Sequence, residues 1–289
     1  MRIWLLAARP RTLPAAVAPV LVGTAYAVGV TDHLRWGTFI AAMLGAIFIQ
    51  IGTNLSNDYS DARRGADTEE RLGPVRVTAG GLVPPKSVLR ATYIAFGCAV
   101  LCGVYLIAVA GWVVLAIGAA SIIAGVLYTG GPRPYGYEGL GEVFVFTFFG
   151  LVAVSGSAYV QLEEFTWEAL ALAVPVGFLA TAILVVNNVR DISTDSRAGK
   201  RTLAVRMGRN RTRGLFALLT YGAFLALIPL AVFITPYVLI AAVAVIGAVP
   251  LVRKVRNHSD GPTLNEALAN SGLLQLVFCV LLSAGLILT

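Results

Sequence analysis

Charged residues are scarce in this sequence, and no polar stretch is long enough to form a soluble domain. Only 13% of the 289 residues are charged, whereas 57% are hydrophobic. A soluble domain of this length carries about twice that charged fraction. Apolar stretches of roughly 20 residues, each long enough to cross a bilayer, recur along the whole chain. The composition excludes a pair of soluble domains and predicts one polytopic membrane domain over residues 1–289, embedded in a lipid bilayer.

Histidine and cysteine are also rare, which excludes two further kinds of site. The two histidines, His33 and His258, lie far in sequence from every acidic cluster, so a zinc site is excluded. Cys98, Cys102 and Cys279 are the only cysteines, and they lie inside apolar segments, where cysteine behaves as a small hydrophobic residue. The cysteines therefore indicate no disulfide framework.

The apolar segments predict an all-α membrane protein, built as a bundle of nine transmembrane helices. Because a span is apolar on most faces, its length and its helix-breaking residues define it better than periodicity does. Arg9 and Pro10 interrupt the first apolar run, so we expect an interfacial lead-in there rather than a secretory signal. The expected spans are residues 12–31, 37–57, 88–108, 111–128, 140–160, 167–189, 214–234, 237–252 and 264–288.

The basic residues predict how these spans are oriented. Of the 22 lysines and arginines, only Arg35 falls in a loop after an odd-numbered span. The positive-inside rule therefore places the N-terminus and the loops after even-numbered spans in the cytoplasm, and the C-terminus outside the cell membrane. The net charge of +7 is mainly a consequence of this bias. We expect no nucleic-acid partner, because the basic residues lie on no soluble surface.

Two acid-rich segments, residues 54–67 and 187–195, interrupt the apolar pattern at the ends of the second and sixth spans. Both are predicted to face the cytoplasm, so they meet there if the bundle closes. Ionised carboxylates beside hydrocarbon are costly unless a cation holds them there. Solvated loop carboxylates are the alternative, but that alternative explains isolated acids better than a pattern that occurs twice. We expect the two segments to bind a shared polyanion through a divalent metal.

Asparagine and aspartate repeat on one helical face within each segment. If the second span stays helical through residue 61, positions i, i+3, i+4 and i+7 fall on one stripe, and the second segment steps by four. These positions are Asn54, Asn57, Asp58 and Asp61 in the first segment, and Asn187, Asp191 and Asp195 in the second. Oxygen-only ligands are typical of Mg²⁺, which takes few carboxylates and completes its shell with water and substrate phosphate.

Basic residues beside the acids would offset the charge of a diphosphate and stabilise it as a leaving group. The alternative is that these residues set the topology and contact lipid headgroups. Arg190 and Lys200 are embedded in the second acid motif, so for these two we favour the diphosphate. The full set of candidates is Arg63, Arg64, Arg76, Arg190, Lys200 and Arg201.

The motif Asn57-Asp58-Tyr-Ser-Asp61 followed by Asp67, together with Asp191-xxx-Asp195, resembles the two aspartate-rich motifs of the UbiA superfamily of intramembrane prenyltransferases. The resemblance implies a nine-helix bundle with cytoplasmic cap loops, which transfers a polyprenyl group from its diphosphate to an aromatic acceptor with Mg²⁺ as cofactor. It implies that Asp58, Asp61, Asp191 and Asp195 hold Mg²⁺ against the polyprenyl diphosphate. The other residues expected to bind substrate are Asn54, Asn57, Arg63, Arg64, Asp67, Arg76, Asn187, Asn188, Arg190 and Lys200.

One departure from the common pattern points to a branch of this superfamily. Where the 4-hydroxybenzoate branch usually has another aspartate, this chain has Gly65, and the acid arrives at Asp67. That variant resembles the menaquinone branch, whose members prenylate 1,4-dihydroxy-2-naphthoate with loss of CO₂ and give demethylmenaquinone. Four further stretches resemble it too, at residues 8–14, 77–82, 128–142 and 187–204. A 4-hydroxybenzoate or tetrapyrrole prenyltransferase is the alternative within the superfamily, and a secondary transporter is the alternative from another class.

The implied mechanism needs an electron-rich wall and a group that holds the acceptor. Departure of the diphosphate leaves an allylic cation, which aromatic faces stabilise. Tyr128, at the cytoplasmic end of the fourth span, is the preferred catalytic aromatic residue. Arg133 is the candidate for binding the acceptor carboxylate. Other aromatic side chains are available at Phe144, Phe148, Phe149 and Tyr159.

Overall fold

Helices and the loops between them make up the part of the chain described by the structure, a computed structural model covering residues 2–66, 72–73 and 75–289. The predicted all-α class is confirmed, as expected where the backbone must satisfy its own hydrogen bonds in lipid. In chain order the elements are α1 (Arg2–Ala8), η1 (Pro10–Thr12), α2 (Pro14–Thr31), α3 (Trp36–Arg63), α4 (Pro85–Ala110), α5 (Val113–Leu127), η2 (Tyr135–Glu138), α6 (Gly141–Val145), η3 (Phe146–Val152), α7 (Ala153–Leu162), α8 (Trp167–Arg197), α9 (Leu203–Met207), α10 (Arg209–Leu225), α11 (Leu227–Phe233), η4 (Pro236–Ala244), α12 (Val245–Asn257) and α13 (Gly261–Ile287).

Within the described residues, 8 helical stretches are long and apolar enough to cross a membrane, one fewer than predicted. The predicted fourth span, residues 111–128, forms the shorter helix α5, which has 15 residues. At 1.5 Å per residue, α5 is about 22 Å long, which is less than the ~30 Å hydrocarbon core. Gly111 ends the preceding helix with a φ of 82°. The multi-pass character is confirmed, whereas the count of nine full spans is not.

Two of the spans change helix type along their length, and a third is interrupted. Gly141–Leu162 runs through α6, η3 and α7, and its middle part η3 is a π-helix. Arg209–Phe233 divides into α10 and α11, and Pro236–Asn257 begins as the 3₁₀-helix η4 before continuing as α12. π-Helical turns inside a longer helix are frequent at functional sites. Here the neighbouring residues Phe148 and Phe149 both line the central cavity.

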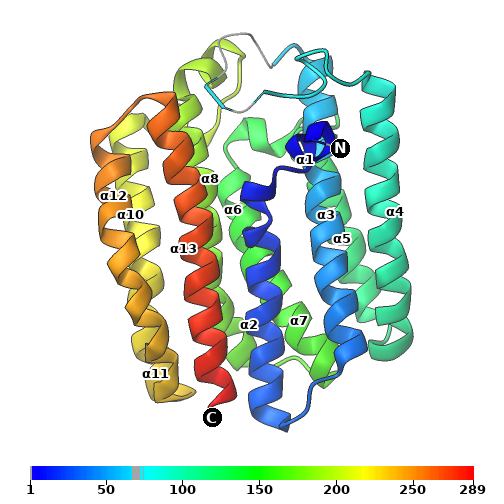
Figure 1. Ribbon diagram of the computed structural model, residues 1–289, viewed down its shortest axis with the longest axis vertical. Helices are drawn as coiled ribbons and strands as arrows, with labels where there is room; N and C mark the ends of the chain where they lie inside the picture. Colours follow the sequence, from blue (N-terminus) through cyan, green and yellow to red (C-terminus); the bar gives the residue numbers. More distant parts are fainter. Residues whose placement is uncertain (1, 67–71, 74) are drawn as a thin grey trace.

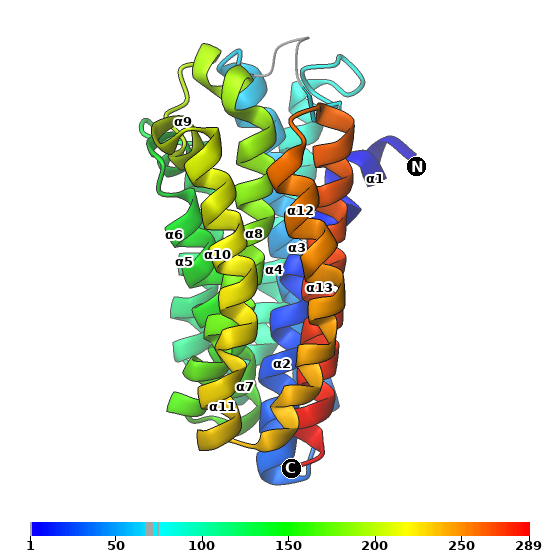
Figure 2. The ribbon, with the colours of Figure 1, turned by 90° about the vertical axis from the view of Figure 1, so that its left-hand side faces the viewer.

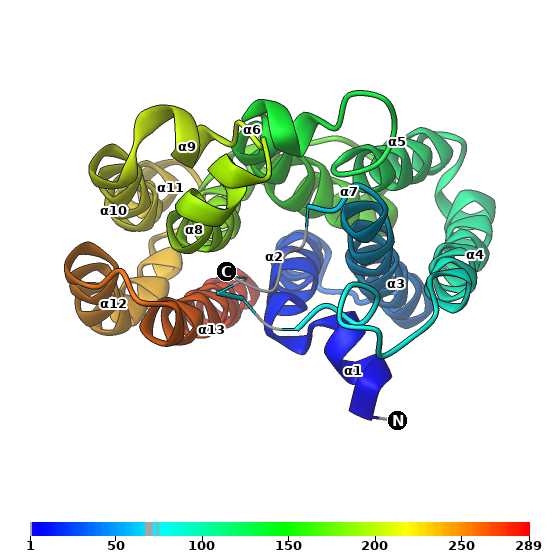
Figure 3. The ribbon, with the colours of Figure 1, turned by 90° about the horizontal axis from the view of Figure 1, so that it is seen from above.

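The helices surround the middle of the bundle, with α10, α12 and α13 on one side and α3, α4 and α5 on the other (Figure 3). Helix α2 lies between these two groups and packs against α13, α7 and α3. The largest cluster of buried apolar side chains joins α2, α8, α10 and α13. This cluster holds the helices that position the second acid-rich segment.

The two acid-rich segments lie at the same end of the bundle, at the C-terminal ends of α3 and α8 (Figure 1). Helix α3 continues through Asp61 to Arg63, as the predicted stripe of acids requires. The N-terminal helix α1 projects sideways near this end, and the C-terminus lies at the other (Figure 2). The opposite end carries exposed Trp36, Trp112 and Trp167, which are typical of a membrane–water interface.

Close backbone packing fixes α8 against the π-helix η3. A Cβ atom added to Gly150 would lie 2.6 Å from the Cα of Gly177, and one added to Gly177 would lie 2.8 Å from the ring of Phe146. Only glycine allows this approach, because real Cβ atoms essentially never come that near. The contact sets the distance between the acid-bearing helix and the aromatic residues around η3.

Candidate active site

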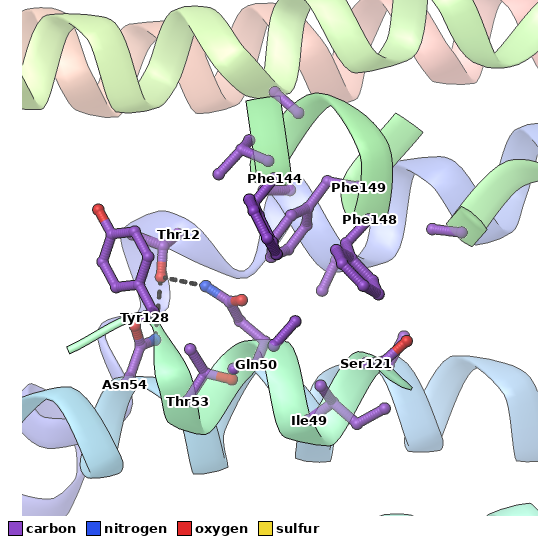
Figure 4. A pocket seen from close by; sticks show the side chains of 18 of the residues that line it. Thr12, Ile49, Gln50, Thr53, Asn54, Ser121, Tyr128, Phe144, Phe148 and Phe149 are labelled. Atoms are coloured by element: carbon purple, nitrogen blue, oxygen red, sulfur yellow. Dashed lines mark hydrogen bonds between the residues drawn. The ribbon is translucent and has the colours of Figure 1, made fainter. Parts of the chain in front are cut away.

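Both acid-rich segments line one cavity of about 380 Å³ in the bundle. Asn57 and Asp61 reach it from α3, and Asn187, Asp191 and Asp195 reach it from α8. The cavity continues from this polar end into a part lined by aromatic and small side chains, seen close by in Figure 4. The expected meeting of the two segments is therefore present in the fold.

Asp61 is the most heavily contacted carboxylate on the α3 side. It is 1% exposed, and its Oδ1 accepts a hydrogen bond of 2.6 Å from the Tyr137 hydroxyl. Its Oδ2 lies 3.4 Å from Lys200 Nζ and 3.5 Å from Arg76 Nη2. Lys200 Nζ also lies 4.7 Å from the centre of the Tyr137 ring. Two cations and a phenol therefore compensate a carboxylate that would otherwise be costly to bury.

On the α8 side, Arg190 holds Asp191 in a two-point contact. Arg190 Nε lies 2.7 Å from Asp191 Oδ1, and Arg190 Nη2 lies 2.5 Å from Asp191 Oδ2. The same guanidinium donates to Asn187 Oδ1 at 2.8 Å and to Asn265 Oδ1 at 2.6 Å. Arg190 is 1% exposed and lies outside the cavity lining. Arg190 therefore orients Asp191 in this structure, and its predicted contact with diphosphate stays a prediction.

Asp58 makes two backbone contacts that were not predicted from the sequence. Its Oδ2 accepts the backbone N–H of Val77 at 3.1 Å, and its Oδ1 accepts that of Thr78 at 2.9 Å. Asp58 is 2% exposed and lies outside the cavity lining, whereas Asp61, one turn later, lines it. The carboxylate thus anchors the loop that carries Arg76. Asp58 therefore has a positioning role in this structure, and metal binding by Asp58 stays a prediction.

The other predicted cations divide into two groups. Lys200 and Arg76 line the cavity, and their binding to a diphosphate stays a prediction. Arg63 is exposed and donates to the Tyr59 hydroxyl at 3.2 Å, and exposed Arg64 donates to the Gly131 carbonyl. Arg133 is exposed and also lies outside the lining. The substrate contacts predicted for these three exposed arginines stay predictions, and Asp67 lies outside the described residues.

The asparagines hold neighbouring elements in place around the cavity. Asn57 Oδ1 accepts from the Thr129 hydroxyl at 2.9 Å, which ties α3 to the end of α5. Asn188 Nδ2 donates to Glu142 Oε1 at 2.9 Å, which ties α8 to α6. Asn54 Nδ2 donates to the Ala8 carbonyl at 3.0 Å, which ties α3 to α1. All three asparagines line the cavity, and their contacts with substrate stay predictions.

A row of aromatic rings leads from the polar end into the cavity. Tyr128 meets Tyr135 edge to face with ring centres 5.4 Å apart, Tyr135 stacks on Phe144 at 3.8 Å, and Phe144 stacks on Phe148 at 6.1 Å. Burial raises the pKa of Tyr135, so its hydroxyl stays protonated at neutral pH and donates to the Ala124 carbonyl at 2.8 Å. Tyr128 and Phe149 also line the cavity, whereas Tyr159 does not.

The donor set around the cavity fits Mg²⁺ in a particular way. The described residues contain no group of three or more acidic, histidine or cysteine side chains close enough to hold a metal by themselves. They offer oxygen donors from both sides of the cavity, including Asp61 from α3 and Asp191 and Asp195 from α8. Mg²⁺ is usually bound by one or two carboxylates plus substrate phosphates and water. The residues therefore fit a metal that is completed by a diphosphate.

Two residues that hold the site together were missed by sequence reasoning. Tyr137 contacts Asp61 from the 3₁₀-helix η2, inside a stretch that had been noted only for its resemblance. Asn265 in α13 accepts from Arg190 and donates to the Leu72 carbonyl at 2.9 Å, which links the two halves of the site. Asn265 lies near the start of α13 beside Glu266, where a polar residue is common, so its sequence position did not mark it.

Comparisons with known proteins agree with this geometry. Residues 16–285 match the UbiA prenyltransferase family. The chain is 41% identical over 284 residues to the 1,4-dihydroxy-2-naphthoate octaprenyltransferase of Mycobacterium tuberculosis, covering 98% of this chain and 96% of that protein. It is 40% identical over 232 residues to the protein of the same name from Escherichia coli, covering 78% and 74%. A solved UbiA homolog from Archaeoglobus fulgidus, bound to GPP and Mg²⁺, shares the fold with a TM-score of 0.64 at 17% identity, covering 97% of this chain and 99% of that one. The chain therefore belongs to the UbiA prenyltransferase family.

Proposed function

We propose that this protein transfers a polyprenyl group from polyprenyl diphosphate to 1,4-dihydroxy-2-naphthoate, with loss of diphosphate and CO₂. The product is demethylmenaquinone, formed as its quinol because both ring hydroxyls are retained. The observation that carries this proposal is one cavity with an acidic and cationic end and an aromatic interior, in a chain whose relatives bear that activity in their names over nearly the full length.

The polar end of the cavity is the proposed site for the diphosphate. Asp61, Asp191 and Asp195 would hold Mg²⁺, and Lys200 and Arg76 would neutralise the remaining phosphate charge. When bound, Mg²⁺ supplies Lewis-acid neutralisation that makes the diphosphate a better leaving group. The contacts of Lys200 and Arg76 with Asp61 support this role, because both cations already lie beside the carboxylate.

The aromatic row is the proposed wall for the allylic cation. The bond between the prenyl carbon and the diphosphate oxygen breaks beside Tyr128, Tyr135 and Phe144, whose ring faces attract the positive charge. The apolar part of the cavity takes the prenyl chain and excludes water, which would otherwise capture the cation as an alcohol. A ring carbon of the electron-rich naphthalenediol then forms the new carbon–carbon bond, and the carboxylate leaves as CO₂.

We also propose that the end of the bundle with the acid-rich segments faces the cytoplasm. Lys and Arg side chains gather in the loops of this end, whereas the opposite end carries the exposed tryptophans Trp36, Trp112 and Trp167. The water-soluble naphthoate would then enter from the cytoplasm and the polyprenyl chain from the bilayer. A secondary transporter is disfavoured, because the acids lie at one end of the bundle rather than at its middle.

The test is an acceptor comparison with the purified protein in lipid nanodiscs. The protein receives polyprenyl diphosphate, Mg²⁺ and one of 1,4-dihydroxy-2-naphthoate, 4-hydroxybenzoate or a tetrapyrrole acid, and the lipid product is identified by mass spectrometry. We expect demethylmenaquinol from the naphthoate, release of one CO₂ per transfer, and loss of turnover when the metal is chelated. Turnover of 4-hydroxybenzoate or of the tetrapyrrole alone would contradict the assignment of the acceptor.

A further inference from the structure

Gln50 is a buried polar residue in the middle of the apolar helix α3 that neither the metal nor the diphosphate accounts for. It lies four residues before Asn54 on the same helical face, lines the cavity and is 7% exposed. Figure 4 shows its side chain reaching toward Thr12, with Phe144 and Phe149 nearby in the same pocket. A polar side chain at such a position in a membrane helix is costly unless it binds something.

The hydrogen bonds of Thr12 fix which atom of the Gln50 amide is used. The Thr12 hydroxyl donates its one proton to the Arg9 carbonyl at 3.0 Å, so Thr12 Oγ1 acts only as an acceptor toward the cavity. It accepts from Gln50 Nε2 at 3.1 Å and from Asn54 Nδ2 at 3.1 Å (Figure 4). The amide nitrogen of Gln50 therefore faces Thr12, and the carbonyl oxygen Oε1 faces away from it.

Gln50 Oε1 lacks a donor among the residues that the structure describes. Buried polar atoms almost always have a hydrogen-bond partner, and one that lacks it in the protein alone is satisfied by a ligand or water. The partner has to carry a hydrogen-bond donor, because Oε1 is a carbonyl oxygen. A polyprenyl diphosphate has no such donor: its chain is hydrocarbon and its phosphates are acceptors. An aromatic diol has two.

We propose that Gln50 Oε1 accepts a hydrogen bond from a ring hydroxyl of the aromatic acceptor, and that the pair Thr12–Gln50 forms a specificity subsite for hydroxylated acceptors. This inference rests on the proposed function and names the group that recognises its second substrate. Gln50 lies eleven residues before Asp61 on α3, so the subsite lies about three helical turns, or roughly 16 Å along the helix axis, from Asp61. That places the acceptor deeper than the diphosphate, beside the aromatic row.

The experiment compares the two substrates in variants of the full-length protein in nanodiscs. Gln50→Leu and Gln50→Met remove the carbonyl oxygen at similar side-chain length, and Ser121→Ala is the control. Ser121 belongs to the same pocket, but its hydroxyl donates to the Ile117 carbonyl at 2.8 Å and has no proton left for a ligand. We expect both Gln50 variants to raise the KM for 1,4-dihydroxy-2-naphthoate roughly ten-fold, the effect of losing one buried hydrogen bond. The KM for polyprenyl diphosphate should change by less than about two-fold, and Ser121→Ala should match the wild type.

Acceptor analogues identify the hydroxyl and separate this inference from the proposed function. 1-Hydroxy-2-naphthoate and 4-hydroxy-2-naphthoate each lack one hydroxyl and are tested as competitive inhibitors. One analogue should bind to the wild-type protein roughly ten-fold more weakly than the other. In the Gln50 variants, this difference between the two inhibition constants should disappear. Equal inhibition by both analogues in wild type and variants, or an equal rise of both KM values, would overturn the subsite. Failure of wild type to use the naphthoate would instead overturn the proposed function.

A separate measurement checks that the variants fold: the Mg²⁺-dependent binding of an unreactive prenyl thiodiphosphate. Variants that bind it like wild type have an intact polar end, so their acceptor kinetics test the subsite directly. If both Gln50 variants lose this binding, the analogue comparison in wild type decides alone. Distinct affinities for the two analogues support the subsite, and equal affinities contradict it.

Discussion

At the scale of single residues, the carboxylates of the site are of two kinds. Some line the cavity, and others hold in place the backbone segments around it. Asp61 and Asp58 are three positions apart on α3, and both are almost fully buried. Asp61 meets a phenol and two cations beside the cavity, whereas Asp58 caps two backbone N–H groups of the loop after α3. Two carboxylates with similar burial on one helix therefore make different contacts.

This difference predicts that only one of two matched variants changes the magnesium requirement. Asp61→Asn removes a charged oxygen donor, so the Mg²⁺ concentration for half-maximal activity should rise roughly ten-fold or more. Asp58→Asn keeps one acceptor for two backbone N–H groups, so it should lower the free energy of unfolding by about 1–3 kcal/mol. It should also reduce activity, but the Mg²⁺ concentration for half-maximal activity should not change. Activity titrations with Mg²⁺ and thermal unfolding in detergent measure both effects. A raised Mg²⁺ requirement in Asp58→Asn would restore the metal role first predicted for it.

Arg190 shows why a residue's place in a motif does not define its contacts. Its sequence position beside Asp191 suggested that it binds a diphosphate. In the structure, its guanidinium donates hydrogen bonds to Asp191, Asn187 and Asn265. Removing one partner from such a buried ion pair is strongly destabilising, because the other charge is left uncompensated. Lys200, nine residues after Asp191 and beyond the helix end, is the cation that reaches the cavity.

At the scale of helices, the sequence predicts well where a helix ends when a long apolar run, a glycine or a proline marks that end. The second span was expected to stay helical through Asp61, and α3 does so to Arg63. The fourth span is shorter than predicted, since α5 begins only at Val113 and ends before a run of two glycines and a proline. The count of spans was therefore the least secure part of the predicted fold.

Side-chain direction is what sequence could not supply. Helical spacing put Asp58 and Asp61 on one stripe, but which of them meets the cavity depends on the loop around Val77, which approaches from outside the helix. The π-helix η3 has no local sequence signature of its own, and it brings both Phe148 and Phe149 to the cavity. Gln50 was overlooked as well, although a glutamine within an apolar span on the acid-bearing face was a visible signal.

The contact between η3 and α8 makes a prediction about these two elements. Gly150→Ala would place a Cβ atom 2.6 Å from the Cα of Gly177, so the helices must separate. We expect a loss of about 1–3 kcal/mol of stability, together with lower activity, because Asp191 and the aromatic row move apart. Gly97→Ala is the control, since an added Cβ there meets nothing within 4 Å and alanine favours a helix. Thermal unfolding of the two variants in the same detergent measures the difference, and equal stability would contradict the packing argument.

At the scale of the whole molecule, the fold solves the electrostatic problem posed by two acid-rich segments near hydrocarbon. Asp61 and Asp191 are 130 positions apart in the sequence, yet α3 and α8 bring them to one cavity. Arg76 and Lys200 balance the α3 side, and Arg190 balances the α8 side. The rest of the cavity stays apolar and aromatic, as a polyprenyl chain and a cationic intermediate require.

The central proposal is that the two segments bind one metal–diphosphate group, and a double-mutant cycle tests it most directly. The affinity of an unreactive prenyl thiodiphosphate is measured with Mg²⁺ for wild type, Asp61→Asn, Asp191→Asn and the double variant. We predict that each single variant weakens binding at least roughly ten-fold, and that the double variant is little weaker than either, because both residues serve one group. Two effects that simply multiply, or single variants that bind like wild type, would contradict a shared site.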